Sequence, residues 1–375
     1  MSEKEYKVAV FVGRFQPFHN EHLTVLNKAL EIADKVLIVI GSYRVAPNTK
    51  NPFTYEERVE MITSLIKHTK TNPDGSTLTT GEHSRVHFIP VRDYYYNDNL
   101  WCAEVQQKTS AFINTGDSVA IVGAYKDASS YYLNLFPQWE FVPIEQKEFL
   151  SSTSIRAQMF WRDTKGLRFP DFNPYHHRFA IESLNNWKFT GDLPAGVADW
   201  VANKYMETRA YHDHVQEYNF LEEYRKKWEA APFVPTFVTT DAVVICSGHV
   251  LVVKRKFNPG KGLWALPGGF LKANESIEDG AIRELREETG IDVPKAALKT
   301  RIKDNKVFDY PGRSLRGRTI THAFCIELVD KELPRVKASS DAAEVRWMPI
   351  YEVYNNQEQF FEDHFFIIET FIQKS

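Results

Sequence analysis

Five short apolar runs in the first 150 residues alternate with stretches whose apolar residues have helical spacing. The first run, residues 8–12, stops at Gly13, and a helical pattern over residues 23–33 leads into the second run. The remaining runs continue this alternation at residues 35–41, 86–91, 119–122 and 140–144, with further helical patterns around residues 58–67 and 103–113. The alternation predicts right-handed βαβ units and therefore a parallel, doubly wound α/β sheet.

The chain of 375 residues is long enough for two domains. Pro232 and Pro235 mark a boundary before a strand-like run at residues 237–245. We therefore expect a first domain over residues 1–194, a helical linker over 195–232 and a second domain over 233–375. The tail, residues 359–372, predicts an amphipathic helix that closes the second domain.

The composition limits the kinds of binding partner and the cell compartment that we expect for this protein. A formal net charge of −3 offers no basic footprint for nucleic acid. No stretch of about 20 apolar residues spans a bilayer, and the N-terminus lacks the apolar run of a signal peptide. The three cysteines are far apart and suggest neither disulfides nor a cysteine metal site. We therefore expect a cytoplasmic protein that binds small molecules rather than nucleic acid or membrane, and a homo-oligomer is compatible with the sequence.

The turn after the first apolar run is a candidate phosphate site. It reads GRFQPFHNEH and carries Arg14, His19 and His22. Two histidines three residues apart at a helix start face one side, beside free backbone N–H groups that attract phosphate. Two surface histidines near a turn are the simpler interpretation of the pair taken alone.

A second polar run, FLSSTSIR, occupies residues 149–156. Its serine and threonine residues can simply cap a helix. The same groups, including Ser152 and Thr153, can instead hold triphosphate oxygens, with Arg156 reaching the β or γ phosphate.

These two runs resemble the HxGH and ISSTxIR motifs of the nucleotidyltransferase superfamily, with Glu21 where glycine is usual. We expect the Glu21 side chain to point away from bound phosphates. NPFTYEER at residues 51–58 and VRDYYYNDNLW at residues 91–101 are similar to segments of archaeal-type nicotinamide-mononucleotide adenylyltransferases. The resemblance implies a Rossmann-like domain that binds substrate through Ser152 and Thr153. It also implies further substrate-binding residues, namely Gly13, Phe15, Gln16, Arg58, Arg92, Asp93, Trp101 and Gly123.

The same resemblance implies a direct displacement. The 5′-phosphate of nicotinamide mononucleotide attacks the α-phosphorus of ATP, which gives NAD and pyrophosphate. Because the nucleophile is already ionised, catalysis rests on positioning and charge stabilisation by His19, His22, Arg14 and Arg156, with Mg²⁺. Trp101 would stack on the nicotinamide ring, and without the resemblance core packing is an equal alternative for it.

The most acidic motif lies at residues 269–291, GFLKANESIEDGAIRELREETGI. Its second half predicts a helix that stops at Gly290, on which Glu284, Glu287 and Glu288 share one face. Clustered carboxylates repel one another unless cations lie between them, and Mg²⁺ shares such oxygen ligands with phosphates. A solvated acidic helix is the alternative for three glutamates alone.

The complete spacing of this stretch resembles the Nudix box. The resemblance implies an α/β/α Nudix domain in which Mg²⁺, for which Mn²⁺ can substitute, is held by Gly269, Glu284, Glu287 and Glu288. Glu287 and Glu288 are the candidates for the general base within the box, and Glu344 is a candidate outside it.

A later loop, residues 306–318, carries Arg313, Arg316 and Arg318. It is either an exposed basic loop or a clamp on a diphosphate. The loop is similar to the Nudix half of bacterial fusion proteins that hydrolyse ADP-ribose to AMP and ribose 5-phosphate.

The order of parts resembles the bifunctional nicotinamide-mononucleotide adenylyltransferase/Nudix hydrolase proteins. It implies ATP, nicotinamide mononucleotide, NAD and ADP-ribose as ligands. One alternative is an adenylyltransferase for another acceptor, such as phosphopantetheine; the NPFT segment and Trp101 argue against it. A second alternative is a nucleotide-sensing regulator whose Nudix domain only binds. The intact box glutamates and the lack of an evident helix-turn-helix argue against that.

Overall fold

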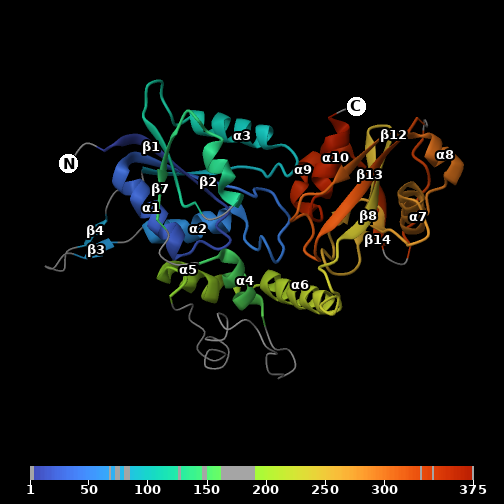
Figure 1. The fold of residues 1–375 in the computed structure, drawn as a ribbon, viewed down its shortest axis with the longest axis horizontal. Helices are drawn as coiled ribbons and strands as arrows, with labels where there is room; N and C mark the ends of the chain where they lie inside the picture. Colours follow the sequence, from blue (N-terminus) through green and yellow to red (C-terminus); the bar gives the residue numbers. More distant parts are fainter. Residues whose placement is uncertain are drawn as a thin grey trace. The chain divides into compact units, whose positions relative to one another are not determined.

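The computed structural model describes residues 4–66, 69–71, 77–79, 85–125, 128–145, 150–161, 191–329, 332–339 and 342–373. The chain forms two compact units (Figure 1). Unit 1 consists of Met1–Tyr43, Thr49–Asp93 and Asn97–Gln216, and unit 2 consists of Arg44–Asn48, Tyr94–Tyr96 and Glu217–Ser375. The expected linker is thus shared between the units, and the division falls inside helix α6 (Arg209–Lys226). In the part of the chain that is described, no helix has the length and apolar character needed to cross a membrane.

Unit 1 is built on a five-stranded sheet in the order β5-β2-β1-β6-β7. All neighbouring strands in it are parallel. Each strand matches an apolar run of the sequence: β1 (Tyr6–Gly13), β2 (Ala33–Ile40), β5 (Val86–Pro90), β6 (Val119–Gly123) and β7 (Glu140–Pro143). The strand order reverses between β1 and β6. In such sheets this reversal creates a crevice beyond the carboxyl ends of the strands, where ligands bind.

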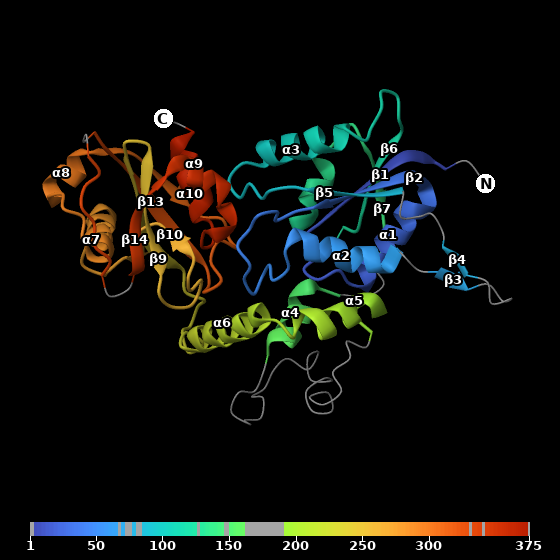
Figure 2. The same cartoon turned by 180° about the vertical axis from the view of Figure 1, so that it is seen from behind.

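Helices cover both faces of this sheet. Helix α3 (Asp98–Ser110) buries Val105 against the β1 side chains Val8, Val10 and Val12. Figures 1 and 2 show α1 and α2 on the opposite side of the sheet from α3. The remaining elements described in unit 1 before α6 are α1 (Asn20–Ile32), α2 (Tyr55–Ile66), the hairpin β3 (Thr69–Thr71) and β4 (Thr77–Thr79), the 3₁₀ helix η2 (Ala128–Asn134), α4 (Ser152–Phe160), α5 (Ala195–Trp200) and the π-helical turn η4 (Val201–Tyr205).

Unit 2 is built on a mixed seven-stranded sheet. Its main path runs β10-β9-β8-β13-β12, with β11 added to β8 and β14 added to β9. Among the strand pairs in the described part of this sheet, only the long β8–β13 pair is parallel. The strands are β8 (Phe237–Cys246), β9 (His249–Arg255), β10 (Trp264–Ala265), β11 (Gly268–Phe270), β12 (Ile302–Phe308), β13 (Thr319–Leu328) and β14 (Ala342–Pro349).

Alternate residues of β8 feed two separate cores. Ala242 and Val244 join the core under helix α7 (Ile277–Thr289), whereas Val243 joins the core under helix α10 (His364–Ile372). The sheet therefore lies between two helical layers, as a strand with a period of two requires. The smaller helices of the unit are α8 (Lys295–Thr300), α9 (Ile350–Asn355) and the 3₁₀ helix η5 (Gln357–Gln359).

Helices α7 and α10 compare differently with the sequence predictions. Helix α7 begins after Ser276, whose Oγ accepts the Asp279 N–H at 3.2 Å, and ends at Gly290, which has a left-handed φ of 52°. The predicted stop at Gly290 is confirmed. The prediction of an amphipathic helix at the tail is wrong, because α10 is buried on nearly all sides. Its run of large apolar residues fills the core rather than covering it.

Candidate active sites

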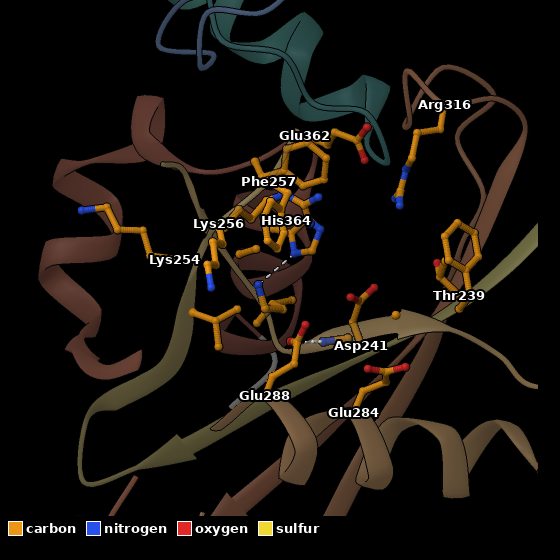
Figure 3. A pocket seen from close by; sticks show the side chains of 18 of the residues that line it. Thr239, Asp241, Lys254, Lys256, Phe257, Glu284, Glu288, Arg316, Glu362 and His364 are labelled. Carbon is orange, nitrogen blue, oxygen red and sulfur yellow. Dashed lines mark hydrogen bonds between the residues drawn. The ribbon is translucent and has the colours of Figure 1, made fainter. Parts of the chain in front are cut away.

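A cavity of about 520 Å³ opens in unit 2 at the carboxylates of α7. Figure 3 shows Glu284 and Glu288 rising from this helix, with Asp241 of β8 between them and Arg316 across the space. Gly268 and Gly269 of β11 also line it. The acidic motif and the arginine loop, which are separate in sequence, therefore meet in one cavity.

Among the carboxyl groups that line this cavity, Glu288 has the pKa that is shifted furthest. Burial raises its pKa to about 8, and the nearby charges of Glu284 and Asp241 act in the same direction. The Gly268 N–H, which donates to Glu288 Oε2 at 3.1 Å, and the Arg255 guanidinium partly offset that rise in pKa. A cation beside a carboxyl group that is held in this way strongly stabilises its ionised form.

Glu284 and Gly269 form the second part of the acidic surface. A Cβ at Gly269 would lie 2.6 Å from Glu284 Oε1, so only glycine allows this close approach. The donor set suits a hard divalent cation, because carboxylate oxygens leave coordination positions open for phosphate and water. Among the described residues, no three Asp, Glu, His or Cys side chains are close enough to hold a metal ion by themselves.

Glu287, the third predicted ligand, does not line this cavity. Its side chain is 56% exposed, and its Oε2 accepts a hydrogen bond from Arg283 Nη1 at 3.0 Å. Arg283 also donates to Glu284 and twice to Glu275, so it braces the outer side of the helix. The structure thus brings two of the three box carboxylates together and leaves Glu287 outside.

The arginine loop contributes two of its three predicted residues. Arg313 and Arg316 line the cavity, whereas Arg318 donates from Nη1 to the Asp309 carbonyl at 2.6 Å and does not line it. Arg313 is buried and forms a bidentate pair with Asp363, at 2.9 Å from Nε and 2.8 Å from Nη2. Arg316 lies over the ring of Phe270, with its guanidinium carbon 5.1 Å from the ring centroid.

Several residues of this cavity escaped the sequence reasoning. Asp241, Arg255 and Glu362 line it, although none belongs to a recognisable motif. Asp241 is fully buried, and burial raises its pKa to about 6, while the Thr321 hydroxyl donates to it at 2.5 Å. Glu344, the candidate base outside the box, does not line the cavity and lies 3.6 Å from Lys254 Nζ.

A second cavity, of about 430 Å³, lies in unit 1 at the end of β1. Gly13, His19, His22 and Gly123 of the predicted site line it, at the reversal of strand order between β1 and β6. Sequence reasoning missed Ser130, Tyr132 and Glu145, which also line it. Glu21 is among the lining residues as well, and the expected direction of its side chain, away from bound phosphates, stays a prediction.

The two histidines form one stacked unit at the start of α1. Their ring centroids are 3.6 Å apart with the planes inclined by 21°, and the backbone N–H of His19 donates to His22 Nδ1 at 3.2 Å. His19 is the residue preceding the helix and is extended, with φ of −128°. Both rings therefore lie at a helix N-terminus, where the free backbone N–H groups favour anions.

Three predicted binding residues instead hold the loops around this cavity. Gln16 exchanges two hydrogen bonds with the backbone of Phe53, at 2.9 and 3.0 Å. Arg58 is buried and donates to the carbonyls of Arg14, Gly41, Ser42 and Thr54, at 2.7 to 3.3 Å. Arg156 donates to the carbonyls of Thr49 and Gln16, at 3.1 and 2.7 Å, and to Thr153 Oγ1 at 3.2 Å. These contacts favour positioning roles.

The residues predicted to bind the pyridine nucleotide do not line the cavity. Asp93 accepts hydrogen bonds from the Ser42 N–H and hydroxyl, at 3.0 and 2.7 Å, and so joins the ends of β5 and β2. Trp101 packs edge-on against Tyr132 and Phe136, with centroids 6.0 and 5.7 Å away, which matches the core-packing alternative. The Arg92 N–H points to Glu104 Oε2 at 3.4 Å.

The remaining predicted residues surround the same turn. Arg14 is exposed, and Phe15 is buried with a positive φ of 53°. Ser152 donates to the Pro17 carbonyl at 3.2 Å, which joins the start of α4 to the turn. A Cβ at Gly123 would lie 2.9 Å from Leu133, so glycine is needed there for packing.

Comparison with family models matches the two parts of the chain separately. A cytidylyltransferase-like model matches residues 10–158, and a NUDIX domain model matches residues 236–370. The cavity of unit 2 lies within the NUDIX match, and the cavity of unit 1 lies within the cytidylyltransferase-like match except for Gly191.

Curated relatives match each half. The first half is 39% identical over 157 residues to a nicotinamide/nicotinic acid mononucleotide adenylyltransferase of Acinetobacter baylyi, covering 42% of this chain and 77% of the relative. The second half is 35% identical over 136 residues to an ADP-ribose pyrophosphatase of Methanocaldococcus jannaschii, covering 36% of this chain and 73% of the relative.

A solved structure matches the whole chain. The crystal structure of a bifunctional NMN adenylyltransferase/ADP ribose pyrophosphatase from Francisella tularensis is 36% identical, with a TM-score of 0.83, and covers 98% of this chain and 99% of that one. A second structure of that description, complexed with AMP and a manganese ion, has a TM-score of 0.81 over the same shares.

Proposed function

We propose, since this chain belongs to the family of bifunctional nicotinamide-mononucleotide adenylyltransferases and ADP-ribose pyrophosphatases, that its two cavities carry the two reactions. Unit 1 transfers the adenylyl group of ATP to nicotinamide mononucleotide, giving NAD and pyrophosphate. Unit 2 hydrolyses ADP-ribose to AMP and ribose 5-phosphate. The observation that carries the proposal is that each cavity gathers charged or polar groups suited to phosphates, in the part of the chain that matches the corresponding relative.

In unit 1, the chain supplies positioning and positive charge. The stacked pair His19 and His22 lies at the N-terminus of α1, where imidazole and backbone N–H groups stabilise the charge that develops on the transferred phosphate. Gly13 and Gly123 let the nucleotide approach the strand ends closely. Arg58 and Arg156 act through the backbone that they hold, and Arg14, whose side chain is exposed, supplies positive charge to the phosphates.

In unit 2, the two ends of the cavity have complementary tasks. Glu284, Glu288 and Gly269 hold the divalent cation, which we propose to be Mg²⁺ and which supplies Lewis-acid activation of the diphosphate. Arg313 and Arg316 bind the diphosphate oxygens from the other side. Of the two candidate bases within the box, only Glu288 lines the cavity, and a cation beside it would keep its carboxylate ionised, so we assign the role of proton acceptor to Glu288. Glu287 is left with an outer, supporting role.

The proposed division of the chain into domains follows from the positions of the two sites. We propose that residues 1–194 carry the transferase site, that 233–375 carry the hydrolase site, and that 195–232 connect them through helices. ATP, nicotinamide mononucleotide, NAD and ADP-ribose are then the small-molecule ligands.

A substrate panel tests both halves at once. Purified wild-type protein, His19→Ala and Glu288→Gln are assayed with ATP plus nicotinamide mononucleotide, and separately with ADP-ribose, in Mg²⁺. We expect His19→Ala to lose only NAD formation and Glu288→Gln to lose only ADP-ribose hydrolysis. Formation of no NAD by the wild type, while another adenylyl acceptor reacts, would overturn the assignment of unit 1. Hydrolysis of no ADP-ribose by the wild type would overturn that of unit 2.

A further inference from the structure

The short segment Tyr94–Tyr96 belongs to unit 2, although the chain on either side of it belongs to unit 1. It lies far outside the NUDIX match, which begins at residue 236. The ring of Tyr96 packs edge-on against Phe308, with centroids 5.0 Å apart, and the neighbouring ring of Tyr95 stacks on Tyr310 at 4.8 Å. Both tyrosines pack against the apolar core that contains α10. The segment is therefore built into the packing of unit 2.

The Tyr96 hydroxyl reaches a buried ion pair at the wall of the hydrolase cavity. It donates to Asp363 Oδ2 at 2.5 Å, and the two residues are 267 positions apart in sequence. The same Oδ2 accepts Arg313 Nε at 2.9 Å, and Oδ1 accepts Arg313 Nη2 at 2.8 Å. Asp363 is completely buried. Because bulk water does not reach this carboxylate, the Tyr96 hydrogen bond has no ready replacement.

Asp363 determines how Arg313 faces the cavity. A planar guanidinium bound through Nε and Nη2 has its orientation fixed, and Nη1 remains to meet a ligand. Arg313 lines the cavity while its side chain is only 2% exposed, so its approach to a ligand is set by this pairing rather than by solvent. Any rotation of Asp363 would turn the guanidinium with it.

We propose that Tyr96 is a positioning residue of the hydrolase site. Its hydroxyl locks Asp363, and Asp363 in turn directs Arg313 toward the diphosphate of a nucleoside diphosphate substrate. This inference rests on the proposed ADP-ribose hydrolysis by unit 2. It assigns a role in that site to a residue that neither the Nudix box nor the arginine loop contains.

The test replaces only the hydroxyl. Tyr96→Phe in the full chain keeps the ring contacts with Phe308, and Tyr351→Phe, at a 69% exposed side chain, is the matched control. Loss of one hydrogen bond to a buried charge predicts a KM for ADP-ribose raised roughly three- to tenfold, with kcat changed less than about twofold. Tyr351→Phe is expected to match the wild type. An unchanged KM in Tyr96→Phe, with the wild type active, overturns the inference.

A double-mutant cycle asks whether Tyr96 acts through Arg313. Lysine at 313 cannot form the bidentate pair, so Tyr96→Phe added to Arg313→Lys should raise KM by less than about twofold. The same rise in both backgrounds would overturn the proposed route. ADP carries a diphosphate, and its affinity in Mn²⁺, measured by calorimetry, compares wild type and Tyr96→Phe without turnover. This measurement separates a failure of ADP-ribose hydrolysis from a failure of the inference, because equal ADP affinities overturn the inference alone.

Discussion

The backbone N–H of Gly268 donates a hydrogen bond to Glu288 Oε2 at 3.1 Å, which fixes one carboxylate oxygen at the edge of strand β11. Gly268 pairs with Asp241 across β11 and β8, so the same contact keeps Glu288 near a second buried carboxylate. A strand therefore organises part of the acidic surface of the hydrolase cavity, even though Glu284 and Glu288 come from a helix.

Replacement of Glu288 tests this arrangement. We expect Glu288→Gln to lower kcat/KM for ADP-ribose hydrolysis by at least about 100-fold, because it removes a charged oxygen donor from the cation site. Glu287→Gln is the matched change one residue earlier, and it should cost less than about tenfold because that side chain is exposed and outside the cavity. Steady-state rates of both variants decide the matter. An equal loss in both would restore Glu287 as a ligand.

The pH dependence of metal binding follows from the raised pKa of Glu288. Below about pH 8 the metal-free carboxyl is mostly protonated, so a bound divalent cation must displace a proton. Mn²⁺ affinity should therefore rise with pH up to about 8 and then level off, with proton release detected by calorimetry in buffers of different ionisation enthalpy. In Glu288→Gln the rise should be much smaller. A wild-type affinity independent of pH from 6 to 8 would contradict the prediction.

The same group affects the stability of the metal-free protein. The pKa of Glu288 in the folded state, about 8, lies above its ordinary value of 4.5. The folded state thus binds more protons in this window, so the contribution of Glu288 is present below pH 4.5 and is lost as the pH rises toward 8. The difference in Tm between Glu288→Gln and the wild type, measured with chelator present, should move in favour of the variant from pH 6 to pH 8. A constant difference would contradict this sign.

Gly269 tests the close approach beside Glu284. In Gly269→Ala the new methyl group would meet Glu284 Oε1 at 2.6 Å, so the carboxylate must move away. We expect Mn²⁺ affinity to fall roughly tenfold, in line with the loss of one well-placed ligand contact. NAD formation by unit 1 should stay unchanged and serves as the control for folding. Retention of wild-type Mn²⁺ affinity would show that Glu284 is not held at this position.

Arg58 distinguishes a structural from a binding role. Arg58→Met would leave the carbonyls of Arg14 and Gly41 without their buried donor, and each such loss costs about 1–3 kcal/mol. We expect the free energy of unfolding, measured in urea, to fall by about 3 kcal/mol or more. Arg14→Met, at an exposed side chain, should leave it nearly unchanged. A fully stable Arg58→Met with weakened binding of nicotinamide mononucleotide would assign Arg58 to the substrate.

Local sequence patterns were sufficient for the elements and for the chemistry class. The apolar runs predicted the five strands of the large sheet of unit 1. The signal is strongest for β1, β2 and β6, because a strand buried on both faces needs a continuous apolar run. Ser276 and Gly290 bound α7 through caps that depend only on neighbouring residues. Spacing also placed the two histidines at a helix start, which the structure confirms.

The sequence did not predict which glutamate side chains on the shared face of α7 point into the cavity. At about 3.6 residues per turn, Glu284 and Glu288 are separated by about 40° around the helix, whereas Glu287 lies about 100° from Glu288. The sequence put all three on one face, but the position of strand β11 over α7 decided which two enter the cavity. Arg283 then holds the third outside through their hydrogen bond.

The sequence by itself determined which chemical groups this protein carries and the local elements that present them, since propensity, capping and period act over a few residues. Tertiary structure alone decided which of those groups face a cavity. The sequence predicts Arg58 as a substrate-binding residue and Arg156 as a phosphate ligand, yet both donate to backbone carbonyls that chain folding brings beside them. Asp241 belongs to no recognised motif, and Tyr96 lies in a segment that resembles the adenylyltransferases. Strand pairing and core packing nevertheless place the first in the hydrolase cavity and the second on the ion pair of Arg313. The physical reason is that burial and hydrogen bonding depend on distant partners, which no local pattern encodes.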